Sequence, residues 1–364
     1  MDYSKYQIVE IGDFAMNHMD LLTGYVDISS RLGVTSPDYR VFSTRDARVC
    51  FNRYHLYLFQ FGYKHRLFYA LGQGASHLGR WRLPADQFNN FELPSPPLAE
   101  QRAIAAFLDA ETARADALVA KQEALIATLQ EKRRALISHT VTRGLDPDAP
   151  MRDSGVPWLG AVPAHWEVKR FRHCCDITEG QTDPKDERFN ERILIAPNHI
   201  QSGTGRILYT ETASEQGAIS GKYLVKPGEI IYSKIRPALN KVCISSGNWL
   251  CSADMYPIQV RDILAVQYFF FFLLSDPFVR LMVEESMRVA MPKVNRETLT
   301  DCPIPIPPKP EQEAIAEYIS LETVEIDTLI AKTQQCIERL REHRTALVAA
   351  AVTGQIDVRG WGAI

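Results

Sequence analysis

Three short stretches of the chain combine amides, hydroxyls and basic side chains at predicted turns: residues 198–206, 232–241 and 288–296. Asparagine and glutamine can bind adenine bidentately, arginine can bind guanine, and lysine and arginine bind phosphates. The stretches therefore predict contacts to DNA. The candidate residues are Asn198, Gln201, Arg206, Ser233, Lys234, Arg236, Asn240, Lys241, Arg288, Lys293, Asn295 and Arg296.

The N-terminal part of the chain carries a reduced version of the same groups. Asn17 and His18 resemble the second stretch, and Arg80 and Arg82 resemble the third. A solvated turn is the better interpretation of any one stretch taken alone. Their recurrence in two parts of the chain makes DNA binding an equally good interpretation.

Groups that could perform catalysis are not found in the sequence. Gly72, Gly74 and Gly79 have the wrong spacing for a dinucleotide-binding loop, and the nucleophile-elbow, HExxH and phosphate-loop motifs are absent. The 7 cysteines form no CxxC pair and no zinc spacing. Cys174 and Cys175 are predicted to pack in a core. We expect a non-catalytic chain that holds no metal or cofactor of its own.

One sequence pattern occurs twice in the chain. Residues 96–105 read PPLAEQRAIA and residues 307–316 read PPKPEQEAIA, an offset of 211 positions. The offset persists without a gap, so that Asp116 matches Asp327 and Thr142 matches Thr353. A repeat this long indicates a whole module used twice.

Each repeat predicts a short proline-rich strand followed by a long helix. The strands are expected at residues 91–94 and 303–306, and the helices at 101–141 and 312–352, each about 60 Å long. The Pro-Pro pair prevents an earlier helix start, and the following glutamate suits the helix dipole. Apolar residues at coiled-coil spacing form a predicted seam: Ile104, Leu108, Ala115, Leu118, Leu125, Leu129 and Leu136, then Ile315, Ile319, Ile326, Leu329, Cys336, Leu340 and Leu347.

Polar residues interrupt this seam and are expected to restrict register and partner choice: Glu111, Gln122 and Lys132, then Glu322, Thr333 and His343. Each helix could simply cover its own domain. The interpretation we favour is that the two helices pair with each other, antiparallel, because a domain of about 150 residues separates them. The predicted fold class is α+β, with two globular α/β domains separated by two long antiparallel helices that form a coiled coil.

The predicted domains are residues 1–93, a central helix and linker at 94–149, a second domain at 150–305, and a C-terminal helix and tail at 306–364. Strands are expected at 193–195, 230–232 and 242–244, and a buried helix at 266–274. The first domain aligns with the latter part of the second, Gly12 falling near Gly228. About 65 residues equivalent to 152–217 have no counterpart, so the first domain is expected to be incomplete at its N-terminus.

Composition is that of an ordinary globular chain of 364 residues, 46% hydrophobic and 23% charged. The net charge is −3, with 18 basic and 18 acidic side chains in residues 150–305 and 10 against 9 in residues 1–93. A DNA-binding face must therefore be a local patch. No signal peptide or membrane-spanning run is recognised, so a reducing cytoplasm is the expected location.

The sequence resembles the specificity subunits of Type I restriction-modification systems. The resemblance is carried by the repeated Pro-Pro-x-x-Glu-Gln motifs before the long helices, by Gly155–Trp158 with His165 and Trp166, and by residues 228–237, whose alternative version is residues 12–19. Together these cover nearly the whole chain.

The resemblance implies two target recognition domains that each read half of a split site on double-stranded DNA, with the paired helices fixing the gap. It also implies partners: modification subunits that methylate adenine with S-adenosylmethionine, and restriction subunits that use ATP and Mg. Two alternatives remain open. One is a shortened relic that reads a single half-site and acts as a docking scaffold; the other is a free-standing nuclease or methyltransferase.

Overall fold

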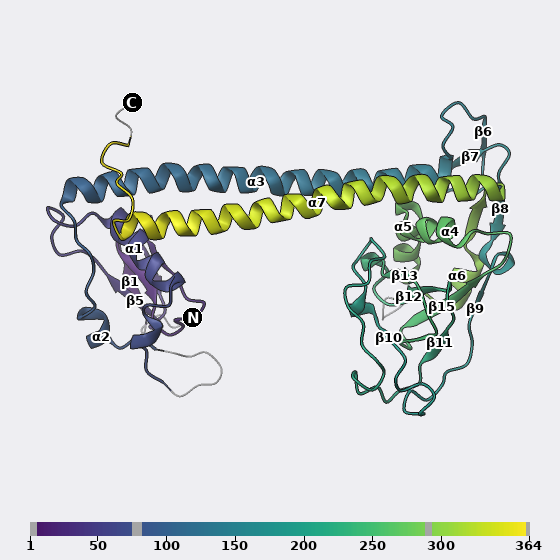
Figure 1. The fold of residues 1–364 in the computed structure, drawn as a ribbon, viewed down its shortest axis with the longest axis horizontal. Helices are drawn as coiled ribbons and strands as arrows, with labels where there is room; N and C mark the ends of the chain where they lie inside the picture. Colours follow the sequence, from purple (N-terminus) through teal and green to yellow (C-terminus); the bar gives the residue numbers. More distant parts are fainter. Residues whose placement is uncertain (1–5, 75–81, 288–292, 362–364) are drawn as a thin grey trace. The chain divides into compact units, whose positions relative to one another are not determined.

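The computed structural model describes residues 6–74, 82–287 and 293–361. The chain divides into two compact units (Figure 1). Unit 1 comprises Met1–Leu125 with Lys332–Ile364, and unit 2 comprises Ile126–Ala331. The long helices α3 (Leu98–Arg143) and α7 (Lys309–Val352) contribute residues to both units.

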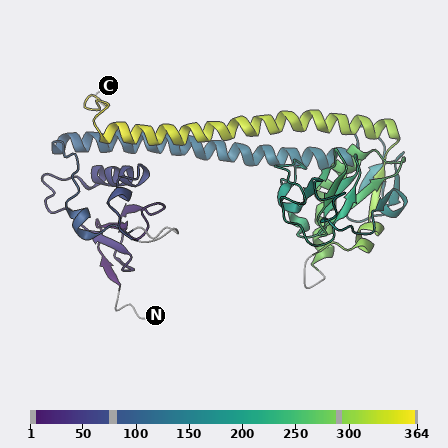
Figure 2. The same cartoon turned by 60° about the horizontal axis from the view of Figure 1, so that its bottom comes forward.

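Helices α3 and α7 pack side by side, as both ribbon views show (Figures 1 and 2). In unit 1, Asp116 Oδ1 lies 3.0 Å from Arg344 Nε, and Glu123 Oε1 lies 2.9 Å from an Arg341 guanidinium nitrogen. Partner numbers fall along α7 as they rise along α3, so the helices are antiparallel. The predicted α+β fold with two sheet-rich domains and a packed pair of long helices is confirmed.

The seam between the helices runs in a slightly different register from the prediction. Ile104, Leu108, Ile315, Ile319 and Ile326 are buried, but Leu118, Leu125 and Leu329 are 40%, 45% and 50% exposed. Leu129, Leu136, Leu340 and Leu347 are half-buried. The predicted leucines at 118, 125 and 329 are therefore not seam residues.

Polar residues are buried or half-buried at several positions of the two long helices. Each lies one residue after a predicted polar interruption, at 111, 132, 322 or 343. Thr112, Arg133 and Thr323 are buried there, and Arg344 is half-buried. The threonines are tolerated because each bonds within its own helix: Thr112 Oγ1 donates to Leu108 O at 2.6 Å. Apolar spacing of three and four fits two neighbouring registers, so it does not by itself decide between them.

Unit 1 contains two small antiparallel sheets and a helix that packs on one of them, β3-β2-β5. The strands are β1 (Gln7–Val9), β2 (Phe14–Asn17), β3 (Val26–Ile28), β4 (Gly33–Thr35) and β5 (Tyr39–Phe42), in the orders β1-β4 and β3-β2-β5. The helices are α1 (Asn52–Lys64), the 3-10 turn η1 (Tyr69–Leu71) and α2 (Ala85–Asn89). Its core includes Phe14, Met16, Val26, Leu56 and Phe59.

Unit 2 is built on the sheets β13-β12-β15-β9, β10-β14-β11, β16-β8 and β6-β7. The strands are β6 (Met151–Asp153), β7 (Ala161–Pro163), β8 (Glu167–Arg170), β9 (Cys175–Ile177), β10 (Leu194–Ile195), β11 (Tyr223–Val225), β12 (Ile230–Ser233), β13 (Val242–Ile244), β14 (Trp249–Cys251), β15 (Met255–Val260) and β16 (Pro303–Ile306). The helices are α4 (Val266–Leu274), α5 (Asp276–Ser286), α6 (Arg296–Asp301) and the 3-10 turns η2 (Phe171–His173), η3 (Pro197–His199) and η4 (Pro237–Leu239).

Strands β1–β5 of unit 1 match strands β11–β15 of unit 2 without a gap. Adding 216 to a residue number in 7–42 gives its counterpart, and the strand pairings agree residue by residue. Phe14 pairs with Phe42 and Ile28, as Ile230 pairs with Ile258 and Ile244. The two units therefore share one backbone frame.

A buried glutamine ties each long helix to its unit. Gln312, 0% exposed, accepts from Ala265 N at 2.6 Å and donates to Ile263 O and Pro307 O at 3.0 and 2.8 Å. Gln101, 211 positions earlier and also 0% exposed, makes the same three bonds, to Phe51 N, Val49 O and Pro96 O, each at 2.8 Å. The amide thus joins the first turn of the long helix to the start of α1 or α4.

Helix α4 is buried along almost its whole length, as the sequence predicted. Tyr268 within it donates to Pro305 O at 2.9 Å, and Tyr54 in α1 donates to Pro94 O at 3.1 Å. In the described residues no single helix is long and apolar enough to cross a membrane. Only α4 and α5 taken together, bent by 61°, match that length and composition.

One predicted strand is not formed. Residues 303–306 form β16, paired with β8, but residues 91–94 are in no strand of the described chain. A strand needs a neighbour for its backbone groups, and unit 1 has no described counterpart of β8. The expectation at 91–94 was wrong for this reason.

Replacing Gln312 by Leu should destabilise unit 2. The substitution leaves one buried N–H and two carbonyls without their partner, and we expect the free energy of unfolding to fall by about 3 kcal/mol. Urea denaturation followed by circular dichroism measures this. Gln101→Leu should affect unit 1 comparably, whereas Gln334→Leu, at an exposed position of α7, should change little. If all three variants were equally stable, the buried glutamines would not be what ties the long helices to their units.

Candidate nucleic-acid interface

The first two predicted stretches lie against each other in unit 2. Gly203 N donates to Asn240 O at 3.1 Å, and Lys241 Nζ donates to Pro197 O at 2.7 Å. Gly205 lies so close to Phe270 that an added Cβ would lie 2.2 Å from its ring. The turn at 201–206 is therefore held at a fixed place beside the loop that follows β12.

The third stretch joins the second along the backbone. Val294 N donates to Lys234 O at 2.7 Å, and Ile235 and Lys293 form an antiparallel bridge. The cations of Lys234 and Arg296 both lie 5.3 Å from the centre of the Tyr256 ring, at cation–π distance. Three segments far apart in the sequence thus form one continuous surface of unit 2.

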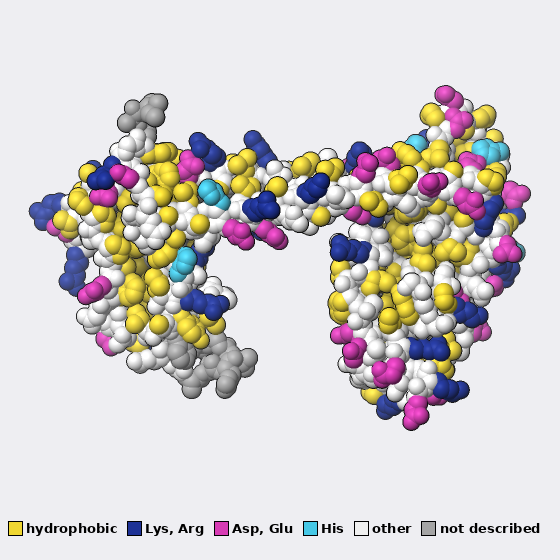
Figure 3. All heavy atoms as spheres, in the orientation of Figure 1, with side chains coloured by type: hydrophobic (Ala, Val, Ile, Leu, Met, Phe, Trp, Pro, Cys, Tyr) yellow, Lys and Arg dark blue, Asp and Glu magenta, His cyan; other side chains and the backbone are white. Residues whose placement is uncertain are grey.

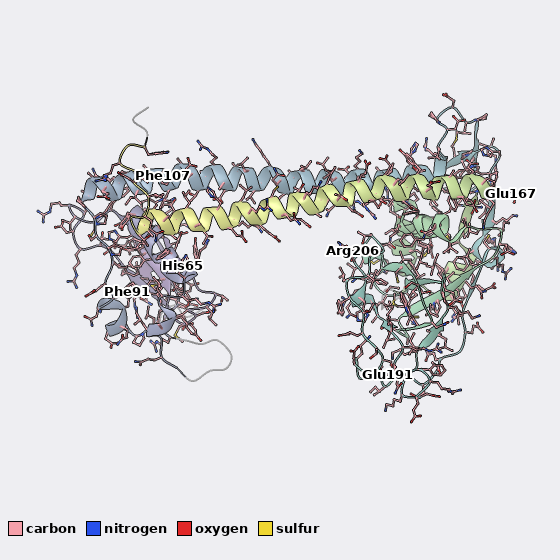
Figure 4. All side chains as sticks on the ribbon, viewed as in Figure 1. His65, Phe91, Phe107, Glu167, Glu191 and Arg206 are labelled. Carbon is pink, nitrogen blue, oxygen red and sulfur yellow. The ribbon has the colours of Figure 1, made fainter. Side chains whose placement is uncertain are left out.

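Exposure separates the candidate residues into groups. Asn198, Gln201, Arg206, Arg236 and Lys293 are exposed, and Lys234, Lys241, Asn295 and Arg296 are half-buried. Ser233 and Asn240 are only 3% and 6% exposed. Arg288 lies outside the described residues. Figure 4 labels Arg206 on the surface of unit 2, with Glu191 farther from the long helices.

Several half-buried candidates position loops. The Arg296 guanidinium donates to Ile177 O and Thr178 O at 3.4 and 3.0 Å and lies 3.5 Å from Glu179. By contrast, no acidic side chain of the described residues pairs with Arg206, Arg236 or Lys293. Their charges are available to an anionic ligand.

The loop after β12 has an uncommon backbone. Arg236 and Asn240 have φ of 48° and 39°, in the left-handed region that costs a non-glycine residue about 1 kcal/mol. Asn240 Oδ1 is buried and makes no hydrogen bond within the described chain. The packed surroundings hold this conformation, so the loop is shaped before any ligand arrives.

A hollow of about 350 Å³ adjoins these loops. Gln201, Thr204 and Asn240 line it from the loops, and Gln130 and Arg134 line it from α3. Neither α3 residue was predicted from the sequence. The basic run Lys132-Arg133-Arg134 is the signal that could have found them, but only Lys132 was considered, as a polar interruption of the seam.

Arg133 in this run is a structural residue. It is 6% exposed, its Nε lies 3.1 Å from Asp327 Oδ1 without hydrogen-bond alignment, and it donates to Gly203 O at 3.1 Å. The matching pair in unit 1 is Arg344 with Asp116. Arg133 thereby connects the helix pair directly to the candidate loop of unit 2.

In unit 1, the candidate residues Asn17 and His18 are half-buried and buried. Asn17 Oδ1 accepts from the backbone of Met19 and Asp20 at 3.0 and 3.2 Å, which closes a turn. His18 is buried, and desolvation, with Arg40 and Arg82 nearby, lowers its pKa, so it is neutral at pH 7. Arg80 lies outside the described residues.

Exposed Arg82 lines a hollow of about 430 Å³ in unit 1 together with Arg40 and Gln73. Arg40 was missed by the sequence analysis. It donates to Leu83 O at 2.9 Å, lies 4.7 Å from the Phe88 ring centre, and occupies the position of Tyr256 in unit 2. Its position in a strand, away from any basic cluster, gave no sequence signal.

The surface does not carry one sign of charge. Figure 3 shows Lys and Arg mixed with Asp and Glu over the visible face of unit 2. In the described residues there is no group of three or more His, Cys, Asp or Glu side chains that could hold a metal ion. Cys174 and Cys175 are buried, and burial raises the pKa of both thiols. The groups that the candidate surface offers to a ligand are therefore hydrogen-bond donors, hydrogen-bond acceptors and charges.

Residues 163–339 match the family described as Type I restriction modification DNA specificity domain. This range contains most of unit 2 and the three loops of the candidate surface. Among curated relatives, the chain is 30% identical over 282 residues to the Type I restriction enzyme EcoDI specificity subunit of Escherichia coli, covering 73% of this chain and 62% of that protein. It is 24% identical to the MjaVIII specificity subunit of Methanocaldococcus jannaschii, covering 75% and 64%.

The solved structures agree on the fold. A chain from a study of the assembly and conformational transition of a type I R-M system superposes with a TM-score of 0.74 at 14% identity, covering 96% of this chain and 84% of that one. The HsdS subunit of Thermoanaerobacter tengcongensis gives 0.52 at 16%, covering 97% and 84%. The chain spans somewhat under two thirds of the length of the first two curated relatives. In sequence over residues 163–339 and in fold, the chain is thus similar to the specificity subunits of Type I restriction-modification systems.

Proposed function

We propose that this chain is the DNA-reading subunit of a Type I restriction-modification complex. The observation that carries the proposal is the single surface that the three polar stretches form in unit 2, with Arg206, Arg236 and Lys293 unpaired among the described residues. These cations would bind phosphates, and Asn198 and Gln201 would contact base edges. The preset left-handed loop reduces the ordering that binding requires.

A second half-site would be read by unit 1 through Arg40 and Arg82. Helices α3 and α7 contribute to both units, so their length would set the gap between half-sites. Because Arg133 bonds to both Asp327 of α7 and the Gly203 carbonyl, the reading loop of unit 2 would be aligned with the helix pair.

The proposed partners are modification subunits that methylate adenine with S-adenosylmethionine and a restriction subunit that uses ATP and Mg, all in the cytoplasm. The docking surface for a modification subunit would be an exposed apolar stripe on α7 in unit 2. Tyr318, Leu321 and Val324 are 40%, 65% and 64% exposed at helical spacing. Beside them lies a groove of about 480 Å³ between α7 and the start of α4.

The alternative is a docking scaffold that reads one half-site only. The placement of Asn17 and His18 favours it, because both side chains serve the interior of unit 1. Under this alternative, unit 1 would contribute at most phosphate contacts.

Replacing Arg206 by Ala and Arg236 by Asn together should weaken DNA binding. Asn tolerates the left-handed backbone, so the fold should persist. If each arginine contacts one phosphate, the slope of log affinity against log salt should fall by about 2. Fluorescence anisotropy at several salt concentrations measures it. Arg188→Ala removes an exposed arginine that pairs with Asp186 and should leave the slope unchanged. An unaltered slope in the double variant would exclude these contacts.

Replacing Gln201 by Ala should relax base choice at one position. A good bidentate contact is worth about 1–3 kcal/mol of discrimination. Methylated adenines mapped by single-molecule sequencing, after co-expression with the modification subunit, report the motif directly. A split motif that becomes less specific at one position of one half supports the proposal. A motif confined to one half supports the scaffold alternative. An unchanged motif would remove Gln201 from the reading surface.

Replacing Leu321 and Val324 by Asp should abolish binding of the modification subunit. Two charges in an apolar interface remain desolvated and unpaired, so affinity should fall at least 100-fold, on the order of 3 kcal/mol. Co-purification and calorimetry measure it. Ile219→Asp, at a residue of unit 2 that is 76% exposed and outside α7, is the matched control. Normal assembly of the double variant would place the dock elsewhere.

A further inference from the structure

The hollow of about 350 Å³ in unit 2 has three walls: α3, the turn that contains Gly203, and η4 with the start of α5. Hydrogen bonds join these walls to one another. Arg133 donates to Gly203 O at 3.1 Å, and Gly203 N donates to Asn240 O at 3.1 Å. Asp276 N donates to Ser138 Oγ at 2.9 Å, which joins α5 to α3. The hollow is therefore formed before any ligand arrives, as small-molecule sites usually are.

Asn240 brings an unpartnered amide to this hollow. The residue is 6% exposed, and its side chain makes no hydrogen bond within the described chain. Its Oδ1 is enclosed but its amide nitrogen is not, so the nitrogen can donate to a molecule in the hollow. The backbone is also held at a φ of 39°. Buried amides without partners and strained backbone are both rare, and strain of this kind gathers at ligand-binding positions.

Further polar groups reach the hollow from α3 and α5. Gln130 and Arg134 are exposed and lie one helical turn apart, so their side chains point to the same side of α3. Asp276 lines the hollow from α5. Within the described part of the chain, these three side chains make no hydrogen bond or ion pair. A guanidinium, a carboxylate and two amides are thus available to a ligand.

Apolar side chains complete the lining. Leu239 is 41% exposed, Val279 is half-buried and Leu274 is 4% exposed. A flat ring can pack on such a surface while amides bond to its edge. A guanidinium binds phosphate, and a carboxylate can accept hydrogen bonds from ribose hydroxyls. Ring, phosphate and ribose together are the parts of a ribonucleotide.

We propose that this hollow binds one free ribonucleoside monophosphate. Arg134 would bind the phosphate, and Gln130 and Asn240 would bond to the edge of the base. The carboxylate of Asp276 would accept from the ribose hydroxyls, which DNA lacks, so it favours a ribonucleotide over a nucleotide of DNA. The inference goes beyond the proposed function, because a free nucleotide can bind whether or not unit 2 reads DNA.

The test is calorimetric titration of the full chain, without DNA, with each of the four common ribonucleoside monophosphates. We expect at least one to bind at a single site, and its deoxyribose analogue and its nucleoside to bind about tenfold more weakly. Arg134→Ala should weaken the nucleotide by about tenfold and leave the nucleoside unchanged. Lys132→Ala is the matched control, because it removes an exposed cation of α3 that does not line the hollow.

Two further variants test the other contacts. Asn240→Gly keeps the left-handed backbone and should weaken nucleotide and nucleoside alike. Asp276→Asn should remove the preference for ribose over deoxyribose while the nucleotide still binds.

Three results would overturn the inference. One is that none of the four nucleotides binds. Another is that inorganic phosphate binds as tightly as the nucleotides, or that Lys132→Ala weakens binding as much as Arg134→Ala, which would mean attraction of any anion. The third is equal affinity for the deoxyribose analogue together with displacement by a duplex that carries an unpaired base, which would make DNA the ligand. Loss of DNA binding in the variant with Arg206→Ala and Arg236→Asn tests the proposed function alone, so the two proposals can fail separately.

Discussion

The buried amide at the first turn of each long helix is the constraint on which the structure depends. Gln312 is fully enclosed, so its N–H and C=O groups need protein partners, and it finds them on three backbone segments. The helix can therefore start at one place only, relative to α4 and β16. Gln101 fixes the start of α3 in unit 1 in the same way. In unit 2, Arg133 then joins α3 to the loop at Gly203.

The two units share a backbone frame but differ in the candidate surface that each presents. Equivalent strands keep their register, yet equivalent surface positions differ in chemistry. Lys234 on the Tyr256 ring in unit 2 corresponds to His18 beside Arg40 in unit 1. A neutral imidazole and a guanidinium offer different contacts from a lysine on an aromatic ring. Buried amides and apolar packing can thus preserve the frame while each unit presents its own surface chemistry.

Features that depend on local pattern could be predicted from the sequence. The repeat, both long helices, β12, β13 and the buried α4 follow from periodicity and from Gly and Pro positions. Features that depend on a neighbour could not. Residues 91–94 have the composition of a strand, but no described strand pairs with them. The seam register depended on hydroxyls such as that of Thr112 bonding within the helix. Arg40 and Arg134 reach the hollows only through tertiary packing.

The balanced charge of residues 150–305 is compatible with an anionic ligand because several of the acidic groups are paired with arginines. Asp176 is held by Arg261, and the bond from that guanidinium lowers the pKa of the carboxyl. Asp301 lies between Arg170 and Arg172. These pairs cancel charge within unit 2, whereas the exposed cations Arg206, Arg236 and Lys293 have no acidic partner in the described chain. Local pairing, rather than net charge, determines where a polyanion can bind. A sum over the sequence conceals this difference, since it gives a paired and an unpaired arginine the same weight.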